Sequence, residues 1–149
     1  MATNELATTA ATARTGIILL SVVTPKGSAV SAETDQVEAP SVHGEFGVLP
    51  GHRPLLAALR AGVVRYRTAG KSLAVAVGPG FAEVSPESVT VLTDRCVEGH
   101  EIDVSVVRVA LEAAQKRLDA FAGPAEGPEF EEVQREVDWQ HALLDAAKG

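Results

Sequence analysis

The side chains best suited to chemistry in this chain are its histidines and its one cysteine, which are His43, His52, His100, His141 and Cys96. Imidazole and thiolate groups bind zinc, and they also act as bases and nucleophiles. No two histidines stand at the helical spacing of a metal site, and no zinc-protease, Cys-x-x-Cys or Gly-x-Ser-x-Gly pattern is present. We therefore expect no catalytic residue, no metal site and no cofactor, and we interpret Cys96 as a small core residue.

A short stretch, Ala69 to Ser72, has the Gly-Lys-Ser order of a phosphate-binding loop. A complete loop needs another glycine five positions before Gly70, where this chain has Arg65, and it opens a helix. Here a β-branched run follows instead. The stretch therefore predicts a hairpin turn between two strands and no nucleotide site.

Residues 44–56 are the most unusual part of the chain, since three glycines and two prolines lie within 13 residues. Such residues fix successive tight turns and leave Glu45 and His52 available at the surface. The segment is either a long connection between two sheets or a rigid loop that displays polar groups to another surface. The residues alone leave both interpretations open.

The first 99 residues must form the frame that holds this loop. They contain short β-branched runs separated by turns rich in Gly and Pro, at residues 17–24, 63–68, 72–77, 81–85 and 89–93. Strands at such intervals are typical of an antiparallel β-sandwich or flattened barrel. We expect this domain over residues 16–99, preceded by a disordered extension at residues 1–15.

Residues 100–149 change to a helical period, and we expect a second domain here. Asp103 is a good N-cap for a first helix whose apolar residues recur every three or four positions, at Val104, Val107, Leu111, Ala114, Leu118 and Phe121. A Gly/Pro segment at 123–128 ends it, and a second helix begins at Glu129 with its apolar stripe at Phe130, Val133, Val137 and Leu144. The pattern predicts an antiparallel helical hairpin with two narrow apolar seams.

Composition excludes several classes of protein. The chain has 149 residues with 20 acidic and 13 basic side chains, a net charge of −7, so it lacks the basic surface that nucleic acids require. One cysteine makes no disulfide framework, and the best apolar run has seven residues, too short to span a membrane. Residues 1–99 carry nine acidic and eight basic groups, whereas residues 100–149 carry eleven and five. The acidity therefore belongs to the hairpin.

Three segments resemble the epsilon subunit of the F-type ATP synthase in order and spacing. They are VVTPKGSAVSAETDQVEAP, GEFGVLPGHRPLLAALRAGVVRYR and GPGFAEVSPESVTVLTD. The resemblance implies a β-sandwich followed by a helical hairpin, in a non-catalytic rotor subunit of the central stalk. It also implies partners, the gamma subunit and the ring of c subunits, and a role in coupling proton flow to ATP synthesis. Contact of the helices with the alpha and beta subunits stays an open alternative.

The resemblance also implies site residues. The loop that faces the c-ring and gamma would comprise Glu45, Gly47, Pro50, Gly51, His52 and Pro54. The location implied is the cytoplasmic face of a bacterial inner membrane, with the mitochondrial matrix side as the alternative. Membrane association would come through the complex alone.

Some members of this family bind ATP through an Ile-Asp-x-x-Arg-Ala pattern at the start of the first helix. Here Ile102 and Asp103 match the pattern, but Val106 and Val107 stand at the Arg and Ala positions. Arg108 follows two residues later, about 200° further round the helix, and cannot replace the missing Arg. We expect no tight ATP binding. The alternative function is a regulatory subunit whose helices inhibit ATP hydrolysis in response to nucleotide.

Overall fold

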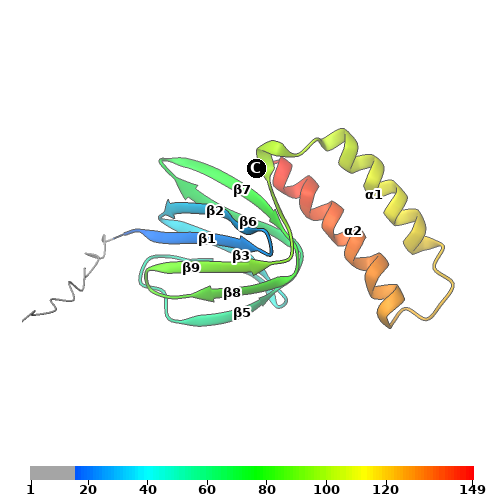
Figure 1. Cartoon of the computed structure of the whole chain (residues 1–149), viewed down its shortest axis with the longest axis horizontal. Helices are drawn as coiled ribbons and strands as arrows, with labels where there is room; N and C mark the ends of the chain where they lie inside the picture. The colour runs from blue at the N-terminus through cyan, green and yellow to red at the C-terminus, as the bar shows by residue number, and fades with distance from the viewer. Residues whose placement is uncertain (1–15) are drawn as a thin grey trace, which may run out of the picture.

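The computed structural model describes residues 16–149 as a β-structure followed by two helices (Figure 1). The predicted extension at residues 1–15 lies outside the described residues. The strands are β1 (Ile18–Thr24), β2 (Gly27–Thr34), β3 (Gln36–Ser41), β4 (Gly44–Val48), β5 (Leu55–Leu59), β6 (Gly62–Thr68), β7 (Lys71–Val77), β8 (Gly80–Val84), β9 (Ser88–Thr93) and β10 (Cys96–Glu98). A 3-10 turn, η1 (Gly99–Glu101), leads to α1 (Val104–Asp119) and α2 (Pro128–Ala147).

The strands form one sheet that folds over on itself, in the order β10-β7-β6-β3-β5-β8-β9-β1-β2, with β4 paired to β3. This confirms the predicted sandwich or flattened barrel. One pair departs from the antiparallel expectation, because β1 runs parallel to β9 over Leu19–Val23. The two strands are about 70 positions apart in the sequence. Their relative direction is set by closure of the sheet rather than by a hairpin turn, so local sequence does not encode it.

Every second side chain along the strands points into the space between the two layers of the folded sheet. These inward side chains are mostly valine, as expected for a chain poor in aromatic residues. The buried cluster comprises Ile18, Leu20, Val22, Val30, Val37, Ala39, Val48, Leu59, Val64, Tyr66, Val75, Val77, Ala82, Val84, Val89 and Val91. Close packing of these branched side chains gives the sandwich a rigid frame for its loops.

The stretch that resembles a phosphate-binding loop is a β-hairpin turn, as predicted. Thr68 pairs with Lys71 across the two strands, which leaves Ala69 and Gly70 as a two-residue turn. Both have positive φ, 49° for Ala69 and 76° for Gly70, the backbone of a type I′ turn. Nearby, Arg67 donates two 3.0 Å hydrogen bonds to the Asp35 carboxylate, which lowers the pKa of Asp35.

Residues 44–56 are more regular than the sequence indicated. Gly44–Val48 is a strand, β4, paired with β3, and β5 begins at Leu55. The irregular connection is therefore confined to residues 49–54. The prediction was too broad, because Gly44 and Gly47 do not interrupt a strand here. Gly44 has a φ of +123° and closes the β3–β4 turn, whereas Gly47 pairs with Glu38 inside the ladder.

Both helices form where the sequence places them. The Asp103 carboxylate accepts hydrogen bonds from the Ser105 and Val106 backbone N–H groups, which confirms the predicted N-cap of α1. The second helix begins at Pro128, one residue before the predicted Glu129, because proline fits the first helical position. At the tip of the hairpin the rings of Phe121 and Phe130 meet edge to face, 5.6 Å between centroids. No helix among residues 16–149 has the length and apolarity to cross a membrane.

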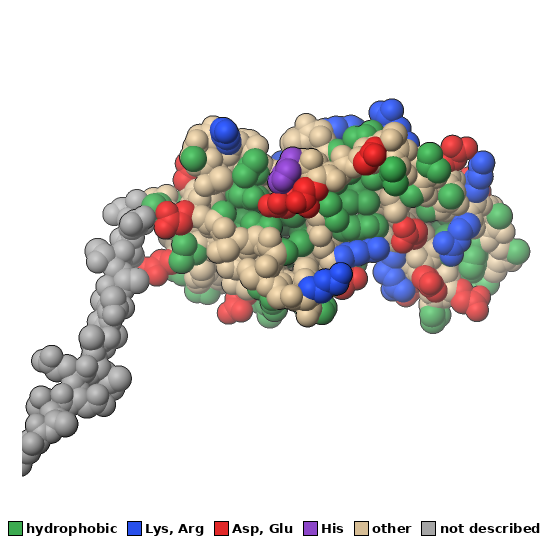
Figure 2. Space-filling model, turned by 45° about the horizontal axis from the view of Figure 1, so that its top comes forward, with side chains coloured by type: hydrophobic (Ala, Val, Ile, Leu, Met, Phe, Trp, Pro, Cys, Tyr) green, Lys and Arg blue, Asp and Glu red, His purple; other side chains and the backbone are tan. Residues whose placement is uncertain are grey.

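The helical hairpin lies against the sandwich rather than standing free of it. Helix α2 packs on β6 and β7, so Trp139, Ala142, Leu143 and Ala146 share a buried cluster with strand residues Val63, Ala74 and Ala76. The predicted narrow seam on the second helix is therefore incomplete. The stripe through Val133 and Val137 is buried as expected, but a second apolar face near the C-terminus covers the sheet. Acidic and basic side chains are interspersed on the exposed side of the hairpin (Figure 2).

Candidate partner-binding surfaces

The connection between β4 and β5, residues 49–54, is held rigidly at one end of the sandwich. Gly51 has a φ of +84°, and its N–H donates a 2.8 Å hydrogen bond to the Pro86 carbonyl oxygen in the β8–β9 turn. The His52 N–H donates to the Leu49 carbonyl oxygen at 3.1 Å, which closes a turn around Pro50. Two prolines and a left-handed glycine thus fix this loop with few degrees of freedom.

Two of the predicted site residues lie on a strand instead of on that loop. Glu45 and Gly47 lie on β4, where they pair with Pro40 and Glu38 of β3. Glu45 and Gly47 are both exposed. The residues between and after them, Phe46 and Val48, face the core, so alternation directs Glu45 and Gly47 outward. Leu49 lies four residue steps along the chain from Glu45, a distance of about 13 Å at about 3.3 Å per extended residue.

The six predicted residues therefore occupy two places. Pro50, Gly51, His52 and Pro54 share the rigid loop, where His52 is half-buried and its Nδ1 lies 2.7 Å from the Arg53 carbonyl oxygen. Glu45 lies beside the β3–β4 turn at the far end of β4, whereas Gly47 lies on β4 two positions before Leu49. The structure therefore places four of the six on the loop and two on the strand that leads into it.

An exposed apolar row crosses β5, β8 and β9, a surface that sequence reasoning did not single out. Its members are Leu56, Ala58, Phe81 and Leu92, and cross-strand pairing sets Ala58 beside Phe81 and Phe81 beside Leu92. Leu56 is 70% exposed, Phe81 53% and Leu92 47%. The helices leave this part of the sheet uncovered (Figure 1). The sequence does contain a signal for this surface, namely large apolar residues at strand positions that face outward. These positions can be recognised only when the strand register is known.

The contact that holds α2 on the sandwich is centred on an aromatic ring. The Arg95 guanidinium lies 4.3 Å from the centroid of the Trp139 ring, and its Nη1 is 3.9 Å from Oε2 of Glu136. The Gln140 amide donates to Oε1 of Glu136 at 2.8 Å. One cation from the β9–β10 connection thus contacts two side chains of α2, one through charge and one through the ring face.

Three of the four positions of the degenerate nucleotide pattern serve the fold. Ile102 packs against the cluster between helices and sheet, and Asp103 caps α1. Val107 is buried in the same cluster at 6% exposure, whereas Val106 is 63% exposed. The Val106 side chain carries no hydrogen-bond donor where the pattern has Arg, and its backbone N–H already donates to Asp103, so its side chain offers nothing to a phosphate group.

A shallow groove between the helices gathers other polar groups. It has a volume of about 320 Å³ and is lined by Arg108, Leu111, Glu112, Gln115, Lys116 and His141. Arg108 and His141 therefore share one groove, although they lie far apart in the sequence. The Lys116 ammonium, however, is 3.2 Å from the Glu112 carboxylate, which already balances that charge.

The chain therefore combines a β-sandwich, which carries an uncovered apolar row and a rigid loop, with a docked helical hairpin. Comparison with known proteins identifies this architecture. A family model described as "ATP synthase, Delta/Epsilon chain, beta-sandwich domain" matches residues 18–99. The ATP synthase epsilon chain of Magnetococcus marinus is 41% identical over 130 residues, covering 87% of this chain and 93% of that relative. The epsilon chain of Desulfatibacillum aliphaticivorans is 46% identical over 106 residues, 70% of this chain and 75% of the relative.

A solved structure agrees on the fold. In the mitochondrial ATP synthase of Euglena gracilis, described as "OSCP/F1/c-ring in rotational state 1", one chain superposes with a TM-score of 0.75 at 23% identity, over 90% of this chain and 82% of that one. The family match covers more than half of the chain, so the chain belongs to the ATP synthase epsilon family and is a non-catalytic subunit. The resemblance in the sequence is thereby confirmed.

Proposed function

We propose that this chain is a rotor subunit of the central stalk of an F-type ATP synthase, which binds the gamma subunit and the c-ring and couples proton translocation to ATP synthesis. Membership of the epsilon family is the observation that carries the proposal. The structural relative from Euglena gracilis, which belongs to an assembly of F1 with a c-ring, supports it. The location of the chain would be peripheral, on the cytoplasmic face of the bacterial inner membrane, or on the matrix side in a mitochondrion.

We assign the gamma contact to the apolar row of Leu56, Ala58, Phe81 and Leu92. A contiguous exposed apolar surface marks an interface, and the opposite part of the sheet is already covered by α2. Burying Phe81 and Leu92 in a partner removes their apolar area from water, at about 25 cal/mol per Å². The row therefore supplies affinity without any charged group.

We assign the c-ring contact to Glu45 and the loop at 49–54. Glu45 is exposed, and an exposed ion pair contributes at most about 1 kcal/mol. Its role would be to set orientation and transmit torque, whereas affinity comes from the row. The rigid backbone of the loop suits this role, because a stiff element transmits force with little deformation.

The experiment is a titration of purified gamma with the full chain and with Phe81→Glu. Placing a carboxylate in an apolar interface should weaken binding at least tenfold. Val109→Glu is the matched control, because Val109 is 70% exposed on α1. Unchanged affinity of Phe81→Glu, or equal losses in both variants, would show that the row is not the gamma contact.

A further inference from the structure

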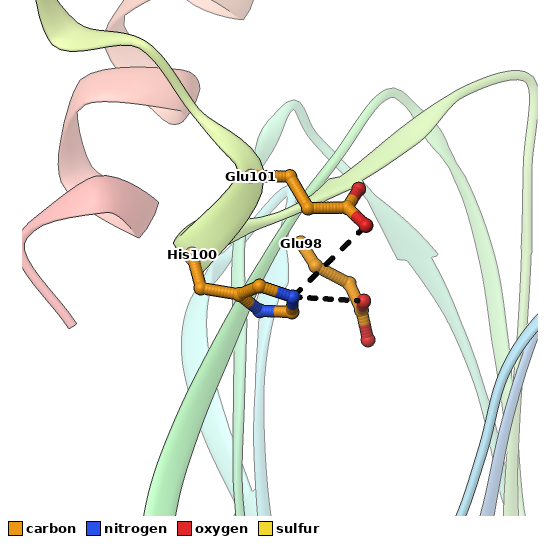
Figure 3. A group of neighbouring side chains, drawn as sticks. All are labelled: Glu98, His100 and Glu101. Atoms are coloured by element: carbon orange, nitrogen blue, oxygen red, sulfur yellow. Dashed lines mark ion pairs between the residues drawn. The ribbon is translucent and has the colours of Figure 1, made fainter.

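A histidine and two glutamates meet where the sandwich joins the hairpin (Figure 3). Glu98 ends β10, and His100 and Glu101 belong to η1, the 3-10 turn that follows. Nε2 of His100 lies 3.7 Å from Oε2 of Glu98 and 4.0 Å from Oε1 of Glu101. One donor atom from each side chain lies within 4.8 Å of the other two. We call these three residues the joint cluster.

No lysine or arginine within residues 16–149 lies at ion-pair distance from either carboxylate of the joint cluster. Among the described residues, the His100 imidazole is the group that stands beside both carboxylates. In Figure 2 a histidine lies directly beside acidic side chains on the surface.

We propose that Glu98, His100 and Glu101 form a binding site for a divalent transition-metal ion, best fitted by Zn²⁺, which stabilises the docked position of the hairpin. Tetrahedral zinc at about 2.1 Å from its ligands holds donor atoms about 3.4 Å apart. The two carboxylate oxygens would need to move about 0.3 and 0.6 Å closer to the His100 nitrogen, and all three donor atoms already lie within 4.8 Å of one another. The fourth position faces solvent and would carry water.

The donor types select the class of metal. Imidazole nitrogen binds Zn²⁺, Cu²⁺ and Ni²⁺, whereas Mg²⁺ and Ca²⁺ take oxygen ligands almost exclusively. One imidazole with two carboxylates therefore favours zinc over calcium or magnesium. The expectation of no metal site is therefore revised by this proposal. A histidine flanked at −2 and +1 by glutamates matches none of the zinc patterns sought in the sequence, yet the 3-10 turn brings it beside both carboxylates.

The backbone beneath the joint cluster depends on the docked hairpin. Gly99 lies between the carbonyl oxygens of Ala74 on β7 and Ala146 on α2, so closely that an added Cβ would overlap the Ala146 oxygen. Glu98 pairs with Val75 through the β10–β7 ladder. The sheet and the end of α2 together fix the residue between two of the ligands. Metal binding and helix docking therefore share the backbone at Gly99, and any stabilisation that one gives to the other is returned in equal measure.

The test titrates ZnCl2 into the full chain by calorimetry and compares His100→Ala and the double variant Glu98→Gln/Glu101→Gln. We expect one ion per chain, and at least tenfold weaker binding in both variants. His43→Ala is the matched control, since His43 is an exposed histidine in the β3–β4 turn. Calcium should give no comparable signal. Absence of zinc binding, or equal affinity in His100→Ala, would overturn the site.

Docking of the hairpin on the sandwich can be followed by tryptophan fluorescence, because Trp139 is the single tryptophan and lies in the helix–sheet contact. Zinc at a hundredfold excess over its Kd should raise the thermal midpoint of Trp139 fluorescence by at least about 3 °C. The increase should vanish in His100→Ala and persist in His43→Ala. Zinc binding without any increase would overturn the link to docking. This inference does not rest on the proposed rotor function, because both measurements use the isolated chain.

Discussion

The guanidinium of Arg95 lies 4.3 Å from the centroid of the Trp139 ring and joins the end of the sandwich to the second helix. Arg95 follows β9 and Trp139 is near the middle of α2, so 44 positions of sequence separate them. The pair sits at the edge of the cluster that buries α2 on β6 and β7. It therefore reports directly on whether the hairpin is docked.

Removing the cation should loosen this contact. Arg95→Ala loses the cation–π contact and the pairing with Glu136, a cost of about 1 kcal/mol. For a chain of this size that lowers the thermal midpoint by about 2–4 °C, measured by Trp139 fluorescence. Arg135→Ala, at an exposed arginine of the same helix, should change it by less than about 1 °C. Equal effects of the two variants would contradict a specific role for Arg95.

A methyl group at Gly99 should separate the hairpin from the sheet. Because the added Cβ overlaps a backbone carbonyl that cannot rotate away, Gly99→Ala should destabilise docking by about 1–3 kcal/mol. Amide exchange in α2 should accelerate while the strands of the buried sandwich core stay protected. Gly47→Ala is the control, since a Cβ there meets nothing within 4 Å. Unchanged exchange in Gly99→Ala would show that the joint adapts without cost.

The start of α1 should lose stability in acid. Hydrogen bonds from Ser105 and from the backbone N–H groups of Val106 and Ser105 lower the pKa of Asp103 below its ordinary 3.8. A lowered folded-state pKa means that the stabilisation is complete above the ordinary value and is lost as the pH falls through the lowered one. Circular dichroism of the helices should show this loss on acidification. Asp103→Asn keeps the cap at neutral pH but should lack this pH dependence. An identical acid profile in both proteins would contradict the assignment.

Reversing the charge at Glu45 should weaken coupling without unfolding the subunit. The side chain is exposed on β4, where a substitution changes stability by about 0.5 kcal/mol or less. In vesicles containing the assembled synthase, Glu45→Lys should lower proton-driven ATP synthesis several-fold, and Glu45→Gln should have a smaller effect. Normal synthesis by the lysine variant would remove Glu45 from the coupling contact.

The regulatory alternative predicts a different result when the hairpin is removed. Residues 100–149 carry a net charge of −6, which would oppose the approach of the hairpin to any acidic surface on a partner subunit. We therefore expect that deletion of residues 102–149 leaves ATP hydrolysis by the assembled enzyme nearly unchanged. Calorimetry with ATP should show no tight binding by the full chain. A several-fold activation on deletion, or micromolar affinity, would favour the inhibitory function.

Local pattern was enough to predict the two kinds of structure and several of their details. Period-two runs and turn glycines predicted the sandwich, and three- and four-residue periods predicted the hairpin. The Asp103 cap and the turn at Ala69 and Gly70 were also correct, because both depend on residues a few positions apart. The three family-like segments likewise predicted membership of the epsilon family.

Other features depend on which surfaces meet after the chain folds. The parallel pairing of β1 with β9 and the exposed row through Phe81 and Leu92 follow from register across distant strands. The second apolar face of α2 acquires its meaning from the sheet that covers it, as the contact between Trp139 and Arg95 shows. The sequence by itself determined the elements and the family, since these are written in local spacing. Only the tertiary structure decided which face of the hairpin is buried and which side chains gather at the joint, because those outcomes depend on contacts between residues far apart in the chain.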